Sequence, residues 1–315
     1  MNEVDDPVAR YLATVFCYGC NLGPSQTARA LGTLDRRQVV WIHAHHITED
    51  QLDAAIRHVI NAYNRFALPR YWGSGRQAAA DGTKWDLYEQ NLLSEYHIRY
   101  GGYGGIGYYH VSDTYIAFFS HFIPCGVWEA VYILDGLPKN ATDIQPDIVP
   151  ADTQGQNAPV FGLAYLLGIQ LMPRIRNWQG LVFARPTSGT QYVHIDSLFG
   201  PPVDWDLIAR HVPDMLRVTL SIKEGRIAAS TVLRKLSSYS RKNKLYQAFR
   251  ELGRAVRTQF LLRYLHEAEL RATRACPRLR RFSGRRFAQI FGTLGPSSRG
   301  RRDHHARRGH NFNEL

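Results

Sequence analysis

The chain has 315 residues, of which 44% are hydrophobic, and this is enough apolar material for cores in two or three domains. No stretch is apolar over the roughly 18 residues that a membrane helix needs, and the acidic, polar start does not resemble a signal peptide. Four cysteines in a chain of this length do not make a disulfide framework. These features argue against a membrane protein and a disulfide-stabilised secreted domain, and they predict a cytoplasmic protein.

The net charge of +12 is concentrated at one end of the chain. Residues 271–315 contain twelve arginines, no lysine and two acids, Asp303 and Glu314, and therefore carry +10. The first 270 residues hold 27 basic and 25 acidic residues, a net charge of +2. Because this larger part is nearly neutral, the high overall pI does not by itself indicate nucleic-acid binding there. Evidence for a DNA partner has to come from particular sites.

Residues 8–66 are predicted to be helical. Between Gln51 and Phe66 the apolar residues recur at helical spacing and form one stripe. Thr48 stands three residues before Gln51, which is the spacing of an N-cap and its capping-box partner. Pro69 and the glycines at 73 and 75 are expected to end the helical region. Residues 1–70 are therefore assigned to a helical N-terminal segment.

Short apolar runs between glycine and proline clusters dominate residues 71–180. The runs at 114–122, 147–151 and 169–175 are predicted to be strands, whereas 127–137 and 157–167 are predicted to be helices. Strands that alternate with helices predict an α/β layer with a partly parallel sheet.

Residues 181–273 are predicted to be helical again, with a long apolar stripe between Leu245 and Tyr264. Beyond Thr273 neither the strand nor the helix period is sustained, and residues 274–315 are expected to be disordered. An arginine-rich, lysine-free segment that begins in mid-helix is typical of GC-rich coding sequence read in another frame. The alternative is a natural disordered basic tail.

Two short motifs suggest chemistry that their surroundings argue against. Gly102, Gly104 and Gly107 match G-x-G-x-x-G, but a dinucleotide site needs a helix directly after the glycines, and the residues that follow are β-branched and aromatic. Cys17 and Cys20 form a C-x-x-C without a second pair or a suitably spaced histidine, so buried thiols on a helix are favoured over a zinc site. We expect a glycine-rich hairpin and no nucleotide cofactor.

Residues 24–43 have the pattern of a helix-turn-helix, with Gly32 at the turn and Asp35 capping the second helix. Three side chains of that helix could reach a DNA groove: Arg36, Arg37 and Gln38. Two packed helices with a short loop are common, however, and a purely structural role is preferred. Three histidines near the end of the helix are expected to be surface residues rather than metal ligands: His43, His45 and His46.

Two aspartates stand out by their surroundings. Asp81 follows small residues and precedes a glycine, and Asp152 lies between a predicted strand and a predicted helix. Acids at the strand ends of an α/β sheet lie where such sheets bind ligands, and two carboxylates that converge there repel one another unless a divalent cation neutralises them. Oxygen ligands suit Mg²⁺ or Mn²⁺, and paired ions promote in-line phosphoryl transfer. On spacing alone, surface or capping aspartates remain the simpler interpretation.

Four segments closely resemble the catalytic region of the Tn3 family of replicative DDE transposases: residues 71–110, 111–137, 151–177 and 241–265. The resemblance runs from about Arg10 to Thr273. It implies a ribonuclease-H-like DDE core at residues 71–180, preceded by the helical segment and followed by a helical insertion at residues 181–273.

In that family two aspartates and one glutamate hold paired Mg²⁺ ions, and the enzyme nicks the transposon 3′ ends and joins the freed hydroxyls to target DNA. The resemblance makes Asp81 the first acid and Asp152 the second, and both are expected to be catalytic and to bind Mg²⁺ or Mn²⁺. Lys84, Arg174 and Arg176 are candidate contacts to DNA phosphates, with solvated surface charge as the alternative for each. The implied partners are transposon ends, target DNA and further copies of the chain or an intact transposase. The implied location is the bacterial nucleoid.

The sequence departs from the family pattern at two places. Pro150 stands where close relatives are expected to have histidine, which would slightly alter the strand before Asp152. The family's glutamate belongs to an Asn-Lys-Ser-Glu type motif that follows Ala272 and Thr273. Near its expected position this chain has no carboxylate but Arg280, Arg281 and Phe282. Three nearby acids occupy positions without a catalytic role in the family and are not assigned one: Glu251, Glu267 and Glu269.

The sequence therefore predicts a fragment of a DDE transposase that lacks the N-terminal part for recognising terminal inverted repeats and is frameshifted after Thr273. We expect little or no strand transfer, because the third carboxylate is missing. The alternative is a non-catalytic fragment that binds DNA or associates with an intact transposase. A third interpretation is a decaying gene whose product is unstable.

Overall fold

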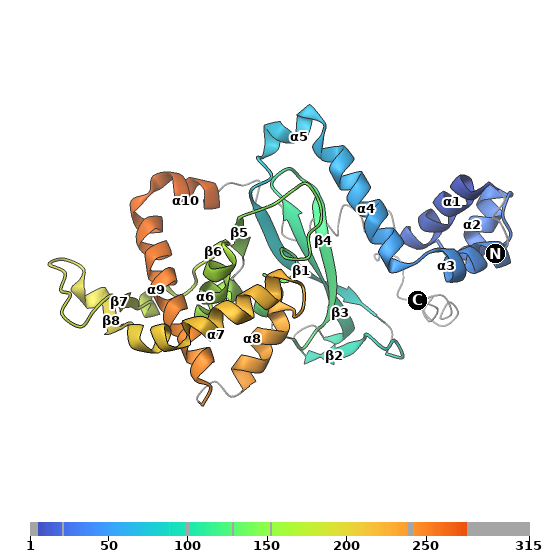
Figure 1. Cartoon of the computed structure of the whole chain (residues 1–315). Coiled ribbons are helices and arrows are strands. Elements are labelled where there is room, and N and C mark those ends of the chain that lie inside the picture. Colours follow the sequence, from blue (N-terminus) through green and yellow to red (C-terminus); the bar gives the residue numbers. More distant parts are fainter. Residues whose placement is uncertain are drawn as a thin grey trace. The chain divides into compact units, whose positions relative to one another are not determined.

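The computed structural model describes residues 6–20, 22–87, 89–98, 101–127, 129–151, 153–238 and 242–275 (Figure 1). The described residues divide into two compact units, one that ends at Val59 and one that begins at Ile60. The described part of the first unit is helical, and the second contains the sheets and the remaining helices. No helix in these ranges combines the length and the apolar composition that crossing a bilayer requires.

The first unit is built from α1 (Pro7–Gly19), α2 (Pro24–Leu31), α3 (Arg36–His46) and most of α4 (Glu49–Asn64). Cys17, Leu34 and Val39 form its small core. The helix-turn-helix predicted from the sequence is present, since Gly32 ends α2 in the left-handed conformation at φ 65° and Asp35 begins α3. Cys17 is a fully buried thiol on α1, as expected, and Cys20 follows that helix as its half-buried C-cap.

Reciprocal capping boxes begin α3 and α4. The Gln38 N–H donates to the Asp35 carboxylate at 2.8 Å, and the Asp35 N–H donates to the Gln38 amide oxygen at 3.0 Å. Thr48 and Gln51 make the same exchange at 3.3 and 3.0 Å, which confirms the predicted cap of α4. The cap engages the amide oxygen of Gln38, and contact of this helix with DNA stays a prediction.

The three histidines of α3 make aromatic contacts. His43 stacks on Tyr18 with ring centroids 3.8 Å apart, and His45 stacks on Trp41 at 5.4 Å. The ring of His46 lies 4.6 Å from the Trp41 ring in a tilted arrangement. His45 is exposed and the other two are half-buried, so only part of this cluster lies fully at the surface.

The helical region ends at Gly73, as predicted, but Pro69 does not contribute to that end. Pro69 lies within the last short helix of the region, α5 (Ala67–Trp72), which ends at Gly73. The amides of the first helical turn have no partner inside the helix, so a proline at the third position removes no hydrogen bond.

A mixed sheet forms the centre of the second unit. Its strands are β1 (Ala78–Asp86), β2 (Glu95–His97), β3 (Gly102–Ser112), β4 (Ala117–Pro124), β5 (Ile148–Ala151) and β6 (Gln170–Pro173). The strand order is β2-β3-β1-β5-β6, and β4 pairs with β3. β2, β1 and β4 are antiparallel to β3, whereas β5 is parallel to both β1 and β6. The predicted mixed α/β architecture with a partly parallel sheet is confirmed.

The glycine-rich segment lies in β3 and is followed by strand, as expected. A side chain at position 104 would place its Cβ 2.3 Å from the backbone oxygen of Trp85 on β1, so a glycine is needed for the close approach of the two strands. The strand predicted at 114–122 is displaced, because residues 113–116 form a turn and β4 begins at Ala117.

The helix predicted at 127–137 is wrong. The described part of this segment is a 3₁₀ turn, η2 (Glu129–Tyr132), followed by further turns, and residues 130–137 are all buried. A segment buried on every side has no polar stripe to select one helical face, so its apolar run did not distinguish a helix from irregular packing. Asp135, within it, is buried and accepts from the Ser230 N–H at 2.8 Å at the start of α8 (Ala229–Ser238).

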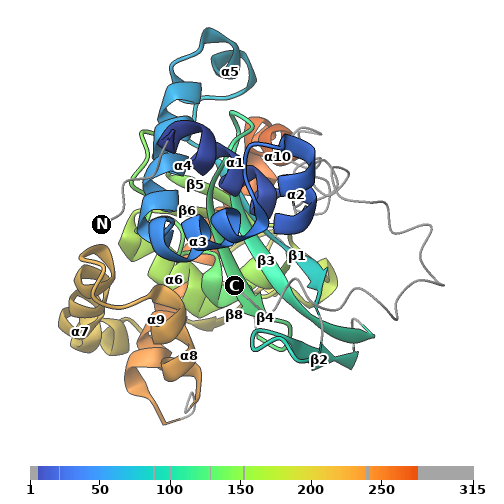
Figure 2. The same ribbon diagram turned by 90° about the vertical axis from the view of Figure 1, so that its right-hand side faces the viewer.

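Two helices far apart in the sequence pack closely on one another. They are α6 (Ala158–Leu167) and α9 (Lys244–His266), both predicted, and their buried residues join those of the sheet in one core (Figure 1, Figure 2). A Cβ on Gly253 of α9 would lie 1.7 Å from the Ala158 oxygen, and a Cβ on Gly162 of α6 would lie 2.3 Å from the Phe249 oxygen. The helix backbones therefore touch where the two glycines meet.

The prediction of helix throughout residues 181–273 is wrong at its start. β7 (Phe183–Arg185) and β8 (Phe199–Pro202) form a separate parallel pair. Prolines at 186, 201 and 202 prevent a continuous helix, and the Ala184 N–H donates to Thr258 Oγ1 of α9 at 2.8 Å, which fixes the pair on that helix. The remaining helices are α7 (Trp205–Lys223), α8, α9 and α10 (Ala268–Ala275), as the sequence predicts.

Candidate functional site

Asp81 lies in β1 at the point where the strand leaves the core. Ala78 and Ala80 are buried, whereas Asp81 is half-buried. Its neighbour across the antiparallel ladder is Tyr109 of β3, and directly opposed side chains in such a ladder lie close together. The Gly82 N–H donates to Asp81 Oδ1 at 2.9 Å. Burial of Tyr109 raises the pKa of its phenol, so Asp81 stands beside a neutral tyrosine.

The sheet register relates Asp81 to the second predicted acid. Ala80, the residue before Asp81, pairs with Ala151 across the parallel ladder of β1 and β5. Asp152 itself lies outside the described residues. Pro150, which has no N–H to donate, lies within β5, yet all four residues of that strand pair with β6. The departure from the expected histidine is therefore accommodated without loss of this pairing.

The two candidate arginines follow β6, the next strand in the sheet. The Arg174 N–H donates to the Ala151 oxygen at 2.9 Å, and the Arg176 N–H donates to Gln156 Oε1 at 3.3 Å. Both side chains are exposed. The backbone of Arg174 thus reaches the last residue of β5, while its guanidinium group remains free to meet solvent or a ligand.

Lys84 is not brought toward Asp81. Side chains of a strand alternate between the two faces of the sheet, and Lys84 is three residues after Asp81 and therefore on the opposite face. Its ammonium group pairs with the Asp86 carboxylate at 2.6 Å, and its own side chain is 22% exposed. It also lies near the buried Cys125, whose thiol has its pKa raised mainly by burial.

Carboxylates of Asp or Glu suit a hard divalent cation, and Asp81 supplies such a donor within β1. Within the described ranges, no group of three or more His, Cys, Asp or Glu side chains is close enough to hold a metal ion. A complete metal site would therefore need donors from positions outside those ranges, of which Asp152 is the one predicted.

The three glutamates near the missing third acid are not gathered at Asp81 by any described contact. Glu251 pairs with Arg254 within α9 at 2.5 Å. Glu267 pairs with Arg263 at 2.8 Å, and this hydrogen bond lowers the pKa of the Glu267 carboxyl. Glu269 lies on α10. The family's third acid was expected near Arg280, Arg281 and Phe282, which lie outside the described residues.

The sequence analysis missed an arginine-lined groove between α6 and α9. Its volume is about 900 Å³, and Arg250, Arg254 and Arg257 line it from α9, opposite Asn157 and Ala158 at the start of α6. The spacing of four and three residues places these arginines on one face of a helix. That signal was present in the sequence, but only the packing of α6 shows that the face is concave.

Comparison with known proteins identifies the family. The model of the Tn3 transposase DDE domain matches residues 1–290, and the chain belongs to this family. The transposase for transposon Tn501 of Pseudomonas aeruginosa is 34% identical over 263 residues, and that for transposon Tn1546 of Enterococcus faecium is 31% identical over 261 residues. Each alignment covers 82% of this chain and 26% of the relative. The transposase for transposon gamma-delta of Escherichia coli K12 is 30% identical over 276 residues, covering 87% of this chain and 27% of that protein.

The resemblance inferred from the sequence is thus confirmed. The chain spans about a quarter of the length of these curated relatives. Proteins of the family generally use divalent metal ions. The family match extends past Thr273 to residue 290, and a change of reading frame after Thr273 stays a prediction.

Proposed function

We propose that this chain is the catalytic region of a DNA transposase, with Asp81 and Asp152 as the acids that serve phosphoryl transfer on DNA. One observation carries the proposal: in a chain of this family, the residues that precede the two aspartates pair with each other on adjacent parallel strands. β5 ends at Ala151, beside Ala80 of the longer β1, and α/β proteins bind ligands beyond the carboxyl ends of their parallel strands. The substrates would be transposon ends and target DNA.

The mixed sheet supports a ribonuclease-H-like core at residues 71–180, with 181–273 as the inserted region. Asp81 and Asp152 would hold Mg²⁺, with Mn²⁺ as a substitute, because both ions prefer carboxylate oxygens. When bound, the ion supplies Lewis-acid stabilisation of charge on the reacting phosphate oxygens. Arg174, whose backbone reaches Ala151, is the better placed of the basic candidates to contact a phosphate near these acids. Arg176 follows on the same exposed segment.

We further propose that this chain by itself is catalytically deficient. The family's third carboxylate is expected near residues 280–282, where the sequence has two arginines and a phenylalanine. With one ligand missing, the second metal ion would bind weakly and the rate would fall by orders of magnitude.

Two measurements separate metal binding from catalysis. Mn²⁺ binding measured by calorimetry should weaken at least tenfold in Asp81→Asn, because a ligand loses its charge. Asp86→Asn is the matched control, since Asp86 lies on the same strand but is paired with Lys84. Equal Mn²⁺ affinity in the two variants would contradict the metal assignment. Incubation with labelled transposon-end duplex and Mn²⁺ should give few 3′ nicks, and robust nicking would refute the proposed deficiency.

A non-catalytic role is the second candidate, and the observation in its favour is the basic segment at residues 274–315. Such a chain would bind DNA, or would assemble with further copies or with an intact transposase and inhibit it. If this segment supplies the affinity, removing it should abolish a steep salt dependence of DNA binding. A salt dependence that survives the deletion would assign the DNA contacts to the folded units.

A further inference from the structure

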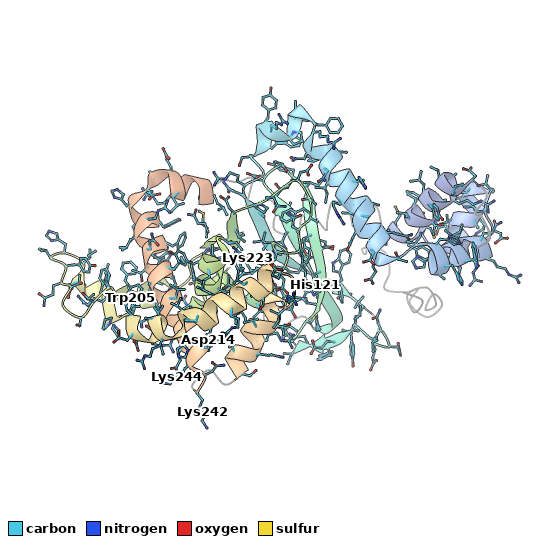
Figure 3. The ribbon with its side chains drawn as sticks, viewed as in Figure 1. His121, Trp205, Asp214, Lys223, Lys242 and Lys244 are labelled. Carbon is cyan, nitrogen blue, oxygen red and sulfur yellow. The ribbon has the colours of Figure 1, made fainter. Side chains whose placement is uncertain are left out.

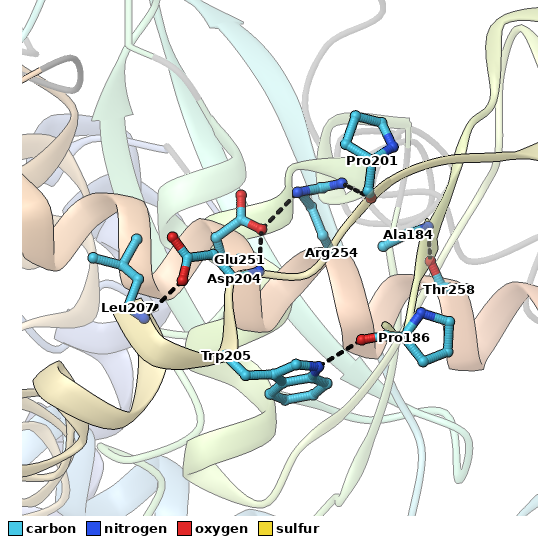
Figure 4. A network of polar contacts seen from close by, with 9 residues as sticks. All are labelled: Ala184, Pro186, Pro201, Asp204, Trp205, Leu207, Glu251, Arg254 and Thr258. Carbon is cyan, nitrogen blue, oxygen red and sulfur yellow. Dashed lines mark hydrogen bonds and ion pairs between the residues drawn. The ribbon is translucent and has the colours of Figure 1, made fainter. Parts of the chain in front are cut away.

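The groove between α6 and α9 contains an unpaired cation. Arg250 is exposed, and no ion pair or hydrogen bond of its side chain occurs within the described part of the chain. Arg254, one helical turn further, is held in place: it pairs with Glu251 at 2.5 Å and donates to the Pro201 oxygen at 2.7 Å (Figure 4). The network of Figure 4 thereby joins one wall of the groove to β8. Three arginines line the groove: Arg250, Arg254 and Arg257. Their net charge remains positive after the negative charge of Glu251, which pairs with Arg254, is counted.

Arg257 is incompletely satisfied. Its Nη1 donates to the Gln156 oxygen at 3.3 Å, but its Nε is buried and has no hydrogen-bond partner among the described residues. A buried donor left unpaired costs free energy, and an anion in the groove would satisfy it. Burial, followed by the neighbouring charge of Arg254, lowers the pKa of the Arg257 guanidinium. An anion in the groove would accept a hydrogen bond from Nε and would stabilise the charged form of the guanidinium.

The opposite wall presents the start of α6. Asn157, its N-cap, makes no side-chain capping bond, and a proline occupies the first turn. Within the described ranges Asn157 Oδ1 is itself buried without a partner, and rotation of the amide would turn its NH₂ toward an acceptor. The amides of a first helical turn and the positive end of the helix dipole favour anions. These amides and the helix dipole add to the attraction of the arginines for an anion, but they would not define a site alone.

The arginines of the groove are spread along α9. A rise of 1.5 Å per residue separates Arg250 from Arg257 by roughly 10 Å along the helix axis, so the arginines can meet successive phosphates of one strand. Lys242 and Lys244, both exposed, extend the basic character to the start of α9 (Figure 3). The contact between Arg257 and Gln156 also ties the groove to η3 (Thr153–Gln156), which begins directly after position 152.

We propose that this groove binds the phosphodiester backbone of duplex DNA, with Arg250 and Arg257 as its principal contacts. The inference rests on the proposed function for the class of ligand, and it assigns the DNA contact to residues that are separate from the candidate acids. Binding through arginine and helix amides is independent of base sequence. The groove would therefore hold DNA in register beside the sheet edge without selecting its sequence.

The test measures the affinity of the full chain for a fluorescein-labelled duplex of unrelated sequence, by anisotropy at several salt concentrations. Arg250→Gln and the double variant Arg250→Gln/Arg257→Gln are compared with Arg210→Gln. Arg210 is also exposed and lies on α7, where its Nε donates to the Asp206 oxygen of the same helix at 3.2 Å. Each groove substitution should lower the salt slope by about one, and the double variant should weaken binding roughly tenfold or more. The basic segment at 274–315 is present in all the proteins, so its contribution cancels in the comparison.

The outcomes separate this proposal from the proposed function. If the groove variants bind as tightly and with the same slope as Arg210→Gln, or if the unmodified chain binds no duplex at low salt, the groove proposal is overturned whatever the acids do. Because Arg250 is exposed, its single variant reports on the groove even if the double variant fails to fold. Inorganic phosphate is the second probe: if it binds in an Arg250-dependent manner while the duplex affinity is unchanged, the ligand is a small phosphate and the DNA assignment is wrong. Loss of binding in the groove variants alongside unaltered Mn²⁺ affinity supports the proposal.

Discussion

The contact between α6 and α9 makes Gly253 the most informative position for a test of the fold. On an isolated helix, Gly253→Ala would stabilise by about 1 kcal/mol, because alanine is the better helix former. In this protein we expect the opposite sign. The new Cβ would lie 1.7 Å from the Ala158 oxygen, which is a backbone atom of a packed helix and cannot rotate away as a side chain would.

The size of the effect follows from the same distance. An ordinary contact begins at 3.4 Å, so the two helices would have to separate or shift across a fully buried core that includes Phe161 and Phe249. Overpacking of this kind costs about 1–3 kcal/mol, and the loss of close packing adds to it. After the gain in helix propensity is subtracted, we expect the free energy of unfolding to fall by about 2 kcal/mol, which corresponds to a drop of about 4–8 °C in Tm.

The assay is urea unfolding at neutral pH, followed by far-ultraviolet circular dichroism. Gly189→Ala is the control, because a Cβ there has no neighbour within 4 Å, and it should leave the midpoint unchanged or raise it slightly. Gly162→Ala, whose Cβ would lie 2.3 Å from the Phe249 oxygen, should also destabilise. The double variant should lose less than the sum, since both changes open the same contact. A midpoint for Gly253→Ala at or above that of the unmodified chain would refute the argument.

Three further predictions concern single buried or half-buried residues. Burial lowers the pKa of His110 from 6.5 to about 4, so the unfolded state takes up a proton first as the pH falls. The free energy of unfolding should therefore fall by about 3 kcal/mol between pH 6.5 and 4. The prediction is wrong if His110→Phe shows the same pH dependence of urea midpoints. Asp135→Ala removes the acceptor of the Ser230 N–H and should destabilise by about 2 kcal/mol, with Asp135→Asn closer to the unmodified chain; equal midpoints for all three would contradict the tertiary cap. Asp81→Asn should change the free energy of unfolding, measured by urea, by less than about 0.5 kcal/mol, and a larger loss would indicate that Asp81 serves the fold.

Several elements were predictable because their signals are local. The capping box of Thr48 and Gln51 begins α4 as expected, and the apolar stripe between Leu245 and Tyr264 corresponds to α9. The wrong predictions concern segments whose structure was not specified by a local signal. Residues 130–137 are buried on every side, so their composition carries no periodic signal, and the prolines around β7 and β8 were outweighed by the helical character of the residues that follow.

The candidate site was likewise predictable only in part. Asp81 could be singled out from its neighbours in the chain, since an acid that follows small residues and precedes a glycine is a local pattern. The pairing of Ala80 with Ala151 could not be predicted from the sequence, because register depends on which strands become neighbours in the sheet. That the side chains of Asp81 and Lys84 lie on opposite faces of the sheet could likewise be inferred only after the strand had been located.

The sequence by itself determined the family, the order of most helices and strands, and the acids that mark the candidate site. The tertiary structure alone decided that Gly162 and Gly253 bring two helix backbones into contact and that three arginines of α9 face the start of α6. The physical reason is that helix periodicity specifies which residues share a face, whereas the element opposite that face is chosen by long-range packing. A row of arginines on a helix is a solvated surface until a second helix turns it into a groove.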